Sequence, residues 1–494
     1  ISTKAKSTFA VQAEVAALRP GHSRAINLGN DKGGVTYVDD FEGSTSSIQL
    51  GQPANQWSLA SVPQGDDIRW PEADTTNNLE TGYNRARLAW YRIDRSSGGG
   101  TCDGDNDYVK IIDRNEIFPE FRNNIPGFNQ FFSTFDLTYW PDERGPYNFD
   151  PPQGSEFSKG IDNTGKLRNP EERWAGIQRS LLQTDFEESN IEYIDIWLLN
   201  PFMDKCDDPN GVSSGGKLII DLGNISEDIL RDSRRFFENG LPRPNSQAKT
   251  DETVWGRIPR VQAINNAFDN DPAVREIQDV GLDGLDDASE STKFEPYLQA
   301  LNNNVDPADI ARFRDDPAGD NFVYFDDYPQ GTNLLERYKA WNNPQGNSKA
   351  SDPGSTRVRS YTNYPDAEDL NRDNTLNESE AYYRYEIPIE PDGIGGMAEN
   401  SYITDRIMSN DGRRTWYRLK IPVHEFSENI GGIQGFRSIR FARMILRGFD
   451  KRITFRFGQF DLVRNQWRRY TQSLCGGDVG GVGGSTFDLN DVNI

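Results

Sequence analysis

Apolar residues recur at every second position in the first segment of the chain. They are Phe9, Val11, Ala13, Val15 and Ala17, with polar residues such as Thr8, Gln12 and Glu14 between them. This period of two predicts a β-strand with one apolar and one polar face. A strand of about ten residues with these faces suits the wall of an outer-membrane barrel, and it also fits an edge strand of a soluble sandwich. We expect residues 1–20 to form a barrel strand and residues 21–35, which are rich in Gly, to form a linker.

Short apolar runs between long polar connections follow, and they predict a first β-sandwich-like module at residues 36–245. The run IEYIDIWLLNPF at 191–202 is apolar on both faces, which is typical of a strand buried between two layers. The run GGKLIIDLGNI at 215–225 predicts its antiparallel neighbour after a glycine turn. Next, Ser226 fits a helix N-cap and Gly240 a C-cap, so a helix is predicted between them.

The remainder divides into a polar insertion, a second strand-rich region and a glycine-rich tail. Residues 246–380 are acidic and rich in Asn, Asp and Pro, with short helices expected after Asp271 and at 334–341. Alternating runs at 381–470 predict a second β-sandwich-like module, and 471–494 a flexible linker. The expected fold is therefore mainly β: two jelly-roll-like sandwich modules with an irregular α-containing insertion, attached to an outer-membrane β-barrel strand.

The charge of the chain argues against some classes of binding partner. The formal net charge is −23 over 494 residues, which argues against binding nucleic acid because phosphates would be repelled. The three cysteines, Cys102, Cys206 and Cys475, form no CxxC pair, and with two histidines they do not favour a zinc site. The sequence does not decide whether Cys102 and Cys206 form a disulfide. The chain begins at Ile1 and reads as part of something longer.

Enzymatic chemistry is not expected. Asp39, Asp40, Glu42 and Asp136 offer carboxylate pairs of the kind that glycosidases use, but an acidic chain of this size contains many such pairs. The sequence also lacks a serine nucleophile elbow and a phosphate-binding loop with its Lys. A set of arginines between residues 437 and 456 predicts a polar strand face, either solvated or paired with acidic surfaces.

The string DLNRDNTLNESE at 369–380 predicts a calcium-binding loop. Oxygen-bearing side chains occupy positions 1, 3, 5, 7, 9 and 12 of an EF-hand-like loop: Asp369, Asn371, Asp373, Thr375, Asn377 and Glu380. Position 6 is Asn374 instead of Gly, and Asn also tolerates positive φ. The alternative is a polar turn held by its own side chains. Two shorter acidic clusters are weaker candidates: Asp103, Asp105 and Asp107, and Asp283, Asp286 and Asp287.

Several long strings resemble one protein family in the same order along the chain. They include YVDDFEGS (37–44), RLAWYRID (87–94), RWAGIQRSL (173–181), DFEESNIEYIDIWLLNPF (185–202), GNISEDILRDSRRFFENGLP (223–242) and DAEDLNRDNTLNESEAY (366–382). These strings resemble the SprA/Sov family, the giant outer-membrane translocons of type IX secretion in Bacteroidetes, which are also required for gliding motility. The chain would be an internal portion of such a protein.

The resemblance implies a function and a set of partners. The family forms a protein-conducting channel in the outer membrane, with large extracellular insertions that cap it. Its partners are a PorV-type barrel, a plug protein, secreted cargo with C-terminal targeting domains, and outer-membrane lipid. The alternative is a carbohydrate-binding surface module or adhesin. Four aromatic residues are candidate contact residues or else core residues: Trp140, Tyr147, Trp174 and Trp197.

Overall fold

The computed structural model describes most of the chain between residues 47 and 464. The described ranges are 47–94, 106–118, 131–203, 211–244, 246–262, 265–329, 331–348, 362 and 364–464. The predicted barrel strand at 1–20, both linkers, the three cysteines and the residues Asp39, Asp40, Glu42, Asp103 and Asp105 lie outside these ranges.

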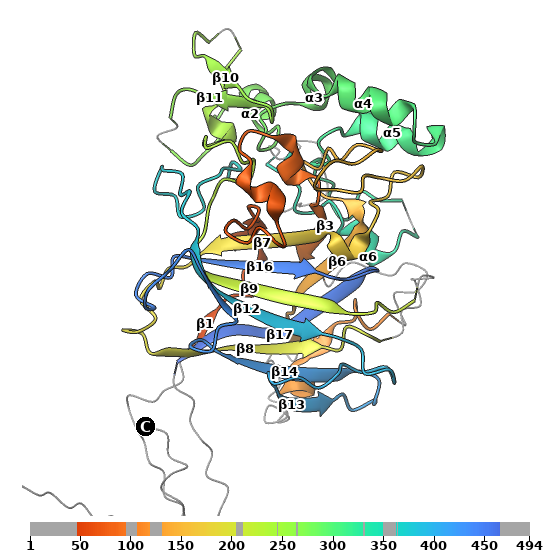
Figure 1. Cartoon of the computed structure of the whole chain (residues 1–494), viewed down its shortest axis with the longest axis vertical. Helices are drawn as coiled ribbons and strands as arrows, with labels where there is room; N and C mark the ends of the chain where they lie inside the picture. The colour runs from red at the N-terminus through yellow and green to blue at the C-terminus, as the bar shows by residue number, and fades with distance from the viewer. Residues whose placement is uncertain are drawn as a thin grey trace, which may run out of the picture. The chain divides into compact units, whose positions relative to one another are not determined.

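Two large antiparallel sheets make up the centre of the described body (Figure 1). The first has the strand order β13 (Ile403–Met408), β14 (Thr415–Pro422), β8 (Ile191–Leu199), β17 (Ile453–Arg464), β6 (Phe135–Arg144) and β3 (Ala86–Tyr91), and β1 (Ser47–Gln49) also pairs with β17. The second has the order β15 (Glu428–Ile430), β12 (Ala381–Ile389), β9 (Gly216–Asn224), β16 (Phe441–Arg447), β7 (Trp174–Ser180) and β2 (Ser58–Leu59). The prediction of a mainly β chain is confirmed, with 30% strand against 15% helix and neither sheet closed.

The strands of the two predicted modules are interleaved. In the first sheet β8 lies between β14 and β17, and in the second sheet β9 lies between β12 and β16. Both large sheets therefore combine strands from 36–245 with strands from 381–470, whereas the sequence predicted a separate module for each stretch. The reason is that β8 and β9 are apolar on both faces, and each gains long partners only from the C-terminal stretch.

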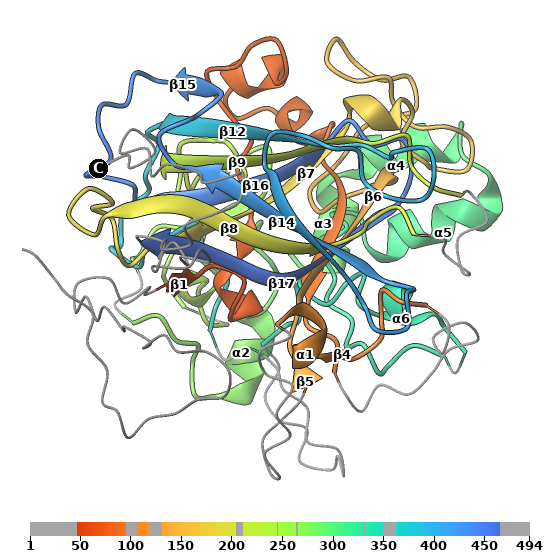
Figure 2. The same ribbon diagram turned by 90° about the horizontal axis from the view of Figure 1, so that it is seen from below.

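One hydrophobic core joins the two sheets. Inward-facing residues of β8 (Ile194, Ile196), β9 (Leu218, Ile220) and β17 (Phe455) belong to a single buried cluster. Strands of both sheets are seen together from below in Figure 2. The described residues 47–464 fall within one compact unit, which spans Ser46–Arg464.

Both sheets are also covered on their outer faces, which explains why their strands read as continuous apolar runs. Trp70 and Ala73, from the segment after β2, pack on Ile219 and Ile445 of the second sheet. Tyr338, next to α6 (Leu334–Arg337), stacks on Tyr91 of the first sheet with ring centroids 4.5 Å apart. The helix predicted at 334–341 is thus present but ends at Arg337.

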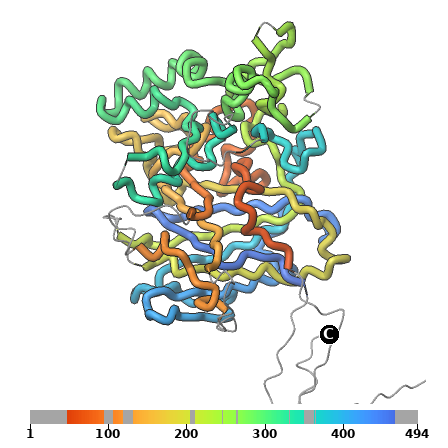
Figure 3. Tube along the Cα trace, turned by 180° about the vertical axis from the view of Figure 1, so that it is seen from behind, coloured from red at the N-terminus to blue at the C-terminus, as the bar shows by residue number. Residues whose placement is uncertain are grey.

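Most helices lie in the insertion, at the far end of the body from β13 and β14 (Figures 1 and 3). They are α2 (Pro272–Gln278), α3 (Asp287–Lys293), α4 (Glu295–Asn302) and α5 (Pro307–Asp315). The predicted cap is confirmed, because the Asp271 side chain accepts a hydrogen bond from the amide of Ala273. A short hairpin of β10 (Thr250–Glu252) and β11 (Arg257–Pro259) adjoins them. None of the helices in the described ranges combines the length and apolarity that a bilayer crossing needs.

The helix predicted between Ser226 and Gly240 is wrong. The structure has only a 3-10 turn there, at Glu238–Gly240. Side chains bind backbone amides in place of a helical carbonyl ladder: Ser226 accepts from Asp228, and Asp228 accepts from Asp232 and Ser233. Ser, Asp and Asn compete with the helix in this way, and Ser233 has a φ of 60°, which no α-helix contains.

Candidate metal centre

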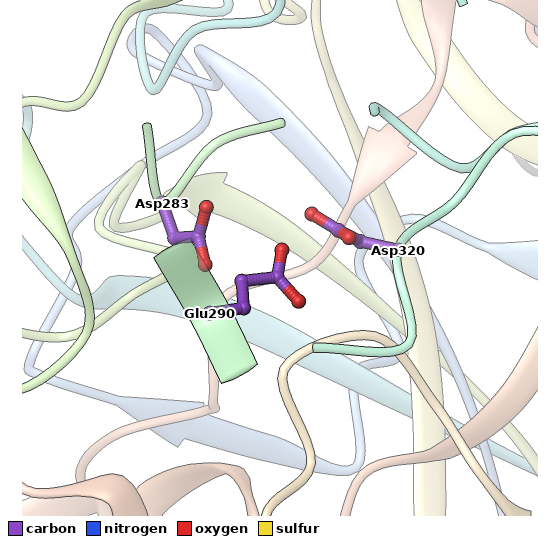
Figure 4. A group of neighbouring side chains, drawn as sticks. All are labelled: Asp283, Glu290 and Asp320. Carbon is purple, nitrogen blue, oxygen red and sulfur yellow. The ribbon is translucent and has the colours of Figure 1, made fainter. Parts of the chain in front are cut away.

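Three buried carboxylates meet in the insertion. Asp283 precedes α3, Glu290 lies in α3 and Asp320 follows α5, and each side chain is fully buried. One carboxylate oxygen from each residue can be chosen so that all three lie within 4.8 Å of one another. Figure 4 shows the three carboxylates gathered at one point, with Asp283 from just before α3, Glu290 from α3 and Asp320 from the segment after α5.

The local sequence explains how these residues come together. Asp286 caps α3 by accepting the amide of Ser289, and this sets the start of the helix so that Glu290 turns inward. Gly281 has a φ of 85°, and a Cβ atom there would overlap Asp320 Oδ2. A glycine is therefore needed for the chain to pass this close to the Asp320 carboxylate.

Each of the three carboxylates has one oxygen fixed by a donor. Asp283 Oδ1 accepts the amide of Leu285 at 2.9 Å, and Glu290 Oε2 accepts the amide of Ala318 at 2.8 Å. Asp320 Oδ2 accepts the hydroxyl of Tyr147 at 2.8 Å. The second oxygens, Asp283 Oδ2, Glu290 Oε1 and Asp320 Oδ1, are buried and have no hydrogen-bond partner among the described residues. Three buried acceptors with nothing to accept from are unusual, because such groups are costly to desolvate.

Negative charge outweighs positive charge at this cluster, where the charges of Lys293 and Arg257 offset only part of the effect of burial on Asp283. Burial, followed by the charges of Asp320 and Asp283, raises the pKa of Glu290 to about 11. Burial also raises the pKa values of Asp283 and Asp320 well above their usual range. Lys293 is directed elsewhere, since its Nζ donates to the carbonyl of Thr253 at 2.7 Å. The site can be neutral only if it takes up protons or a cation.

A second group of carboxylates adjoins the first and shares Glu290. Asp287 and Asp316 are partly buried, and an oxygen of each lies within 4.8 Å of the others in a set with Glu290. Asp287 also accepts the side-chain amide of Asn321 at 2.9 Å. The donor set is entirely oxygen, which suits a hard cation such as Ca²⁺ and not zinc or copper.

Comparison with known protein families gives a match for the C-terminal part of the chain. Residues 296–494 match the SprA_N family model, described as motility related/secretion protein. Over these residues the chain is similar to the SprA/Sov family. The resemblance found in the sequence strings is thereby confirmed. No curated protein matches the chain.

The SprA_N match covers only one of the three carboxylates of the candidate metal centre. It begins within α4 and includes Asp320 together with β12 to β17, whereas Asp283 and Glu290 precede it. The strands of the match cannot form their sheets alone, because β14 and β12 pair with β8 and β9, which lie outside it. The structural unit that carries the SprA_N region is therefore larger than the matched segment.

A calcium-binding loop is predicted at 369–380. The first half of this segment is a turn in which side chains of the turn accept hydrogen bonds from its own backbone amides. Asp369 accepts the amides of Asp373 and Asn374, and Asp373 accepts the amide of Thr375 at 2.8 Å. The Asn371 side chain accepts the amide of Asp373 at 2.9 Å. These contacts bring Asp369, Asn371, Asp373 and Thr375 together on one turn.

The last two predicted ligands of this loop point to other partners. The Asn377 side chain donates to the carbonyl of Ile225 at 2.6 Å. Glu380 is buried in an ion pair with Arg443, with Nη1 and Oε1 2.9 Å apart. Calcium binding at this loop stays a prediction, and Glu380 would have to leave Arg443 to close the shell.

Other predicted site residues have structural partners. Asp136 pairs with Arg456 at 3.0 Å in the interior, and Asp107 pairs with Arg414 at 2.8 Å. The four candidate contact aromatics, Trp140, Tyr147, Trp174 and Trp197, are at most 4% exposed and lie in the core. The arginine set is not one solvated face, because Arg443 and Arg456 are buried ion-pair partners.

The sequence identified only part of the triple-carboxylate cluster. Asp283 and Asp287 belong to a predicted acidic cluster, but its third member, Asp286, caps α3. Asp320 was missed because it is distant in sequence from Asp283, and Glu290 because nothing in the acidic run set it apart from its neighbours. The helix-start signal at Asp286 is the one sequence feature that could have singled out Glu290, one helical turn further on.

Proposed function

We propose that this chain is a section of a giant outer-membrane protein-conducting channel, the translocon of type IX secretion. In this proposal the channel exports proteins to the cell surface and supports gliding, and the described body forms mainly extracellular cap structure. The observation that carries the proposal is the match of residues 296–494 to a motility and secretion family.

The architecture supports a role beside a conduit. The two large sheets are open and share a core filled with side chains such as Leu198, Leu222 and Phe457, so the described body has no lumen of its own between them. Its acidic composition suits a solvated surface. In the proposal a PorV-type barrel, a plug protein, outer-membrane lipid and cargo with C-terminal targeting domains bind the channel.

Export and motility test the translocon role. An in-frame deletion of residues 47–464 from the full-length protein should abolish release of cargo bearing C-terminal targeting domains, and it should stop gliding. The matched control is Arg437→Ala, which removes an ion pair that is 79% exposed on the arginine side. Normal cargo export by cells that carry the deletion in a stably produced protein would refute the role.

Surface labelling tests the extracellular placement separately. Ile394 is 92% exposed, between glycines whose Cβ positions meet nothing within 4 Å. Ile394→Cys should react with a membrane-impermeant maleimide on intact cells, beyond the background of the parent protein. The control is Ile196→Cys, in the core, which should not react. Labelling of Ile394→Cys only after the outer membrane is opened would move the body to the periplasmic side.

A further inference from the structure

We infer that Asp283, Glu290 and Asp320 bind a calcium ion. The two oxygens of a Ca²⁺ shell that face each other across the ion lie at most about 5 Å apart, given metal–oxygen distances of about 2.3–2.6 Å. The three carboxylates meet this limit, since their ligand oxygens lie within 4.8 Å. This site is independent of the secretion role proposed above and is separate from the loop at 369–380.

The unpaired oxygens distinguish this site from an ordinary cluster of acidic residues. Asp283 Oδ2, Glu290 Oε1 and Asp320 Oδ1 are buried without a donor, while their sister oxygens are held by Leu285, Ala318 and Tyr147. Fixed sister oxygens orient the carboxylates, which is the arrangement that supports metal ligands in proteins. A bound cation would supply the missing partner for all three oxygens at once.

The surroundings favour calcium over other cations. Asp287 and Asp316 form a second carboxylate set with Glu290 beside the site, and bidentate carboxylates with water would fill the shell of six to eight oxygens that calcium takes. Magnesium prefers a small octahedral shell with several waters, which this carboxylate-rich and buried site suits less well. The donor set contains no nitrogen or sulfur, so zinc is not favoured.

The site would fasten the helical insertion to the sheets. Asp320 and the turn before it contact Tyr147, just beyond β6, through the Tyr147 hydroxyl and through a 2.7 Å hydrogen bond from the Tyr147 amide to the carbonyl of Ala318. Glu290 contributes α3 to the same point. A cation here would therefore join α3 to the turn after α5, and Asp320 would link both to the segment after β6 through Tyr147.

Calorimetry of the full 494-residue chain tests the inference. The chain is stripped with EGTA and titrated with CaCl₂ in the Asp373→Ala background, so that the loop at 369–380 does not contribute. We expect one calcium ion to bind, and Glu290→Gln in the same background to weaken binding on the order of 100-fold. Saturating calcium should raise the Tm of the Asp373→Ala chain by roughly 3 °C. It should leave the Tm of the chain that also carries Glu290→Gln unchanged.

Terbium provides a second readout with a residue-specific signal. Tb³⁺ in the site should be sensitised by the Tyr147 ring, whose hydroxyl lies 2.8 Å from Asp320. Tyr147→Phe should lower this emission, while Asp373→Ala should leave the Tyr147-dependent part unchanged. If Glu290→Gln does not fold, Asp283→Asn replaces it, because Asn keeps the Oδ1 acceptor for the Leu285 amide.

Three results would overturn the inference. The Asp373→Ala chain could bind no calcium and keep its Tm in EGTA, which would mean that the carboxylates share protons only. Calcium could bind equally well after Glu290→Gln, or after Asp283→Asn where that variant replaces it, which would place the ion elsewhere. Magnesium could bind more tightly than calcium, which would contradict the assignment of the ion.

Discussion

At the scale of residues, the buried charges in the middle of the second sheet are matched by specific partners. Asp221 of β9 is fully buried and binds two arginines, Arg384 of β12 and Arg443 of β16, at 2.8 and 2.9 Å. Arg443 also pairs with Glu380. Strand pairing explains the arrangement, because Arg384 and Arg443 both lie opposite Asp221 in the register. One carboxylate thus neutralises charge from both neighbouring strands.

Asp221→Asn should destabilise the protein by about 3 kcal/mol, because it leaves two buried guanidinium groups without their shared anion. Urea unfolding followed by circular dichroism measures the change in the free energy of unfolding. The control is Arg437→Ala, whose pair with Glu187 is largely exposed and should cost less than about 1 kcal/mol. Equal effects of the two substitutions would contradict this account.

Asp232 should make stability depend on pH. Burial, followed by the charge of Asp228, raises the pKa of Asp232 to about 7, against about 3.9 in an unfolded chain. The folded state therefore holds a proton that the unfolded state has lost between these values, and stability falls as pH rises from about 4 to about 7. Asp232→Asn should flatten this part of the profile and stabilise the protein at pH 8 by about 2 kcal/mol. The free energy of unfolding of the parent and of Asp232→Asn is measured by urea titration across this pH range. Parallel pH dependences of the two proteins would refute the role of Asp232.

At the scale of elements, strands were easier to predict than helices in this chain. Strands β8 and β9 lie in the apolar runs at 191–202 and 215–225, and β12, β14, β16 and β17 lie in the stretch 381–470 predicted to be strand-rich, because hydrophobic pattern reports burial directly. The segment after Ser226 has helix-cap residues, yet tertiary contacts decide its form. Glu368 accepts the amides of Leu230 and Phe236, so the segment folds as a coil around a distant carboxylate.

The turn after β15 offers a test of local backbone geometry. Gly431 and Gly432 have φ angles of 68° and 69°, which disfavour side chains. A Cβ on Gly431 would also overlap the backbone carbonyl of Glu380, whereas one on Gly432 meets nothing within 4 Å. Gly431→Ala should therefore cost about 3 kcal/mol and Gly432→Ala about 1 kcal/mol. Thermal unfolding of the two variants compares them, and equal Tm values would contradict the predicted clash.

At the scale of the whole molecule, the family match and the folding unit differ in extent. Residues 296–494 contain β12 to β17 but lack β6 to β9, which pair with them in the middle of both sheets. The family match thus covers a segment whose fold depends on residues that precede it.

A fragment of residues 296–494 should not fold by itself. Without β8 and β9, the edges of β12, β14, β16 and β17 stay unpaired, and exposed edges of this kind promote aggregation. Size-exclusion chromatography and thermal unfolding should show an aggregated fragment without a cooperative transition, while the complete chain shows one. A monomeric fragment that melts cooperatively would mean that the interleaved pairing is not required.

The sequence by itself determined the class of secondary structure, the places of the long strands and the resemblance to the SprA/Sov family, because hydrophobic period and long residue strings are local properties. It also indicated the acidic loop at 369–380 and part of the cluster at Asp283. Tertiary structure alone decided that the two strand-rich stretches share their sheets, that Glu380 binds Arg443, and that Glu290 and Asp320 join Asp283. These outcomes depend on which distant segments exclude water from one another, and no local pattern in the chain encodes that choice.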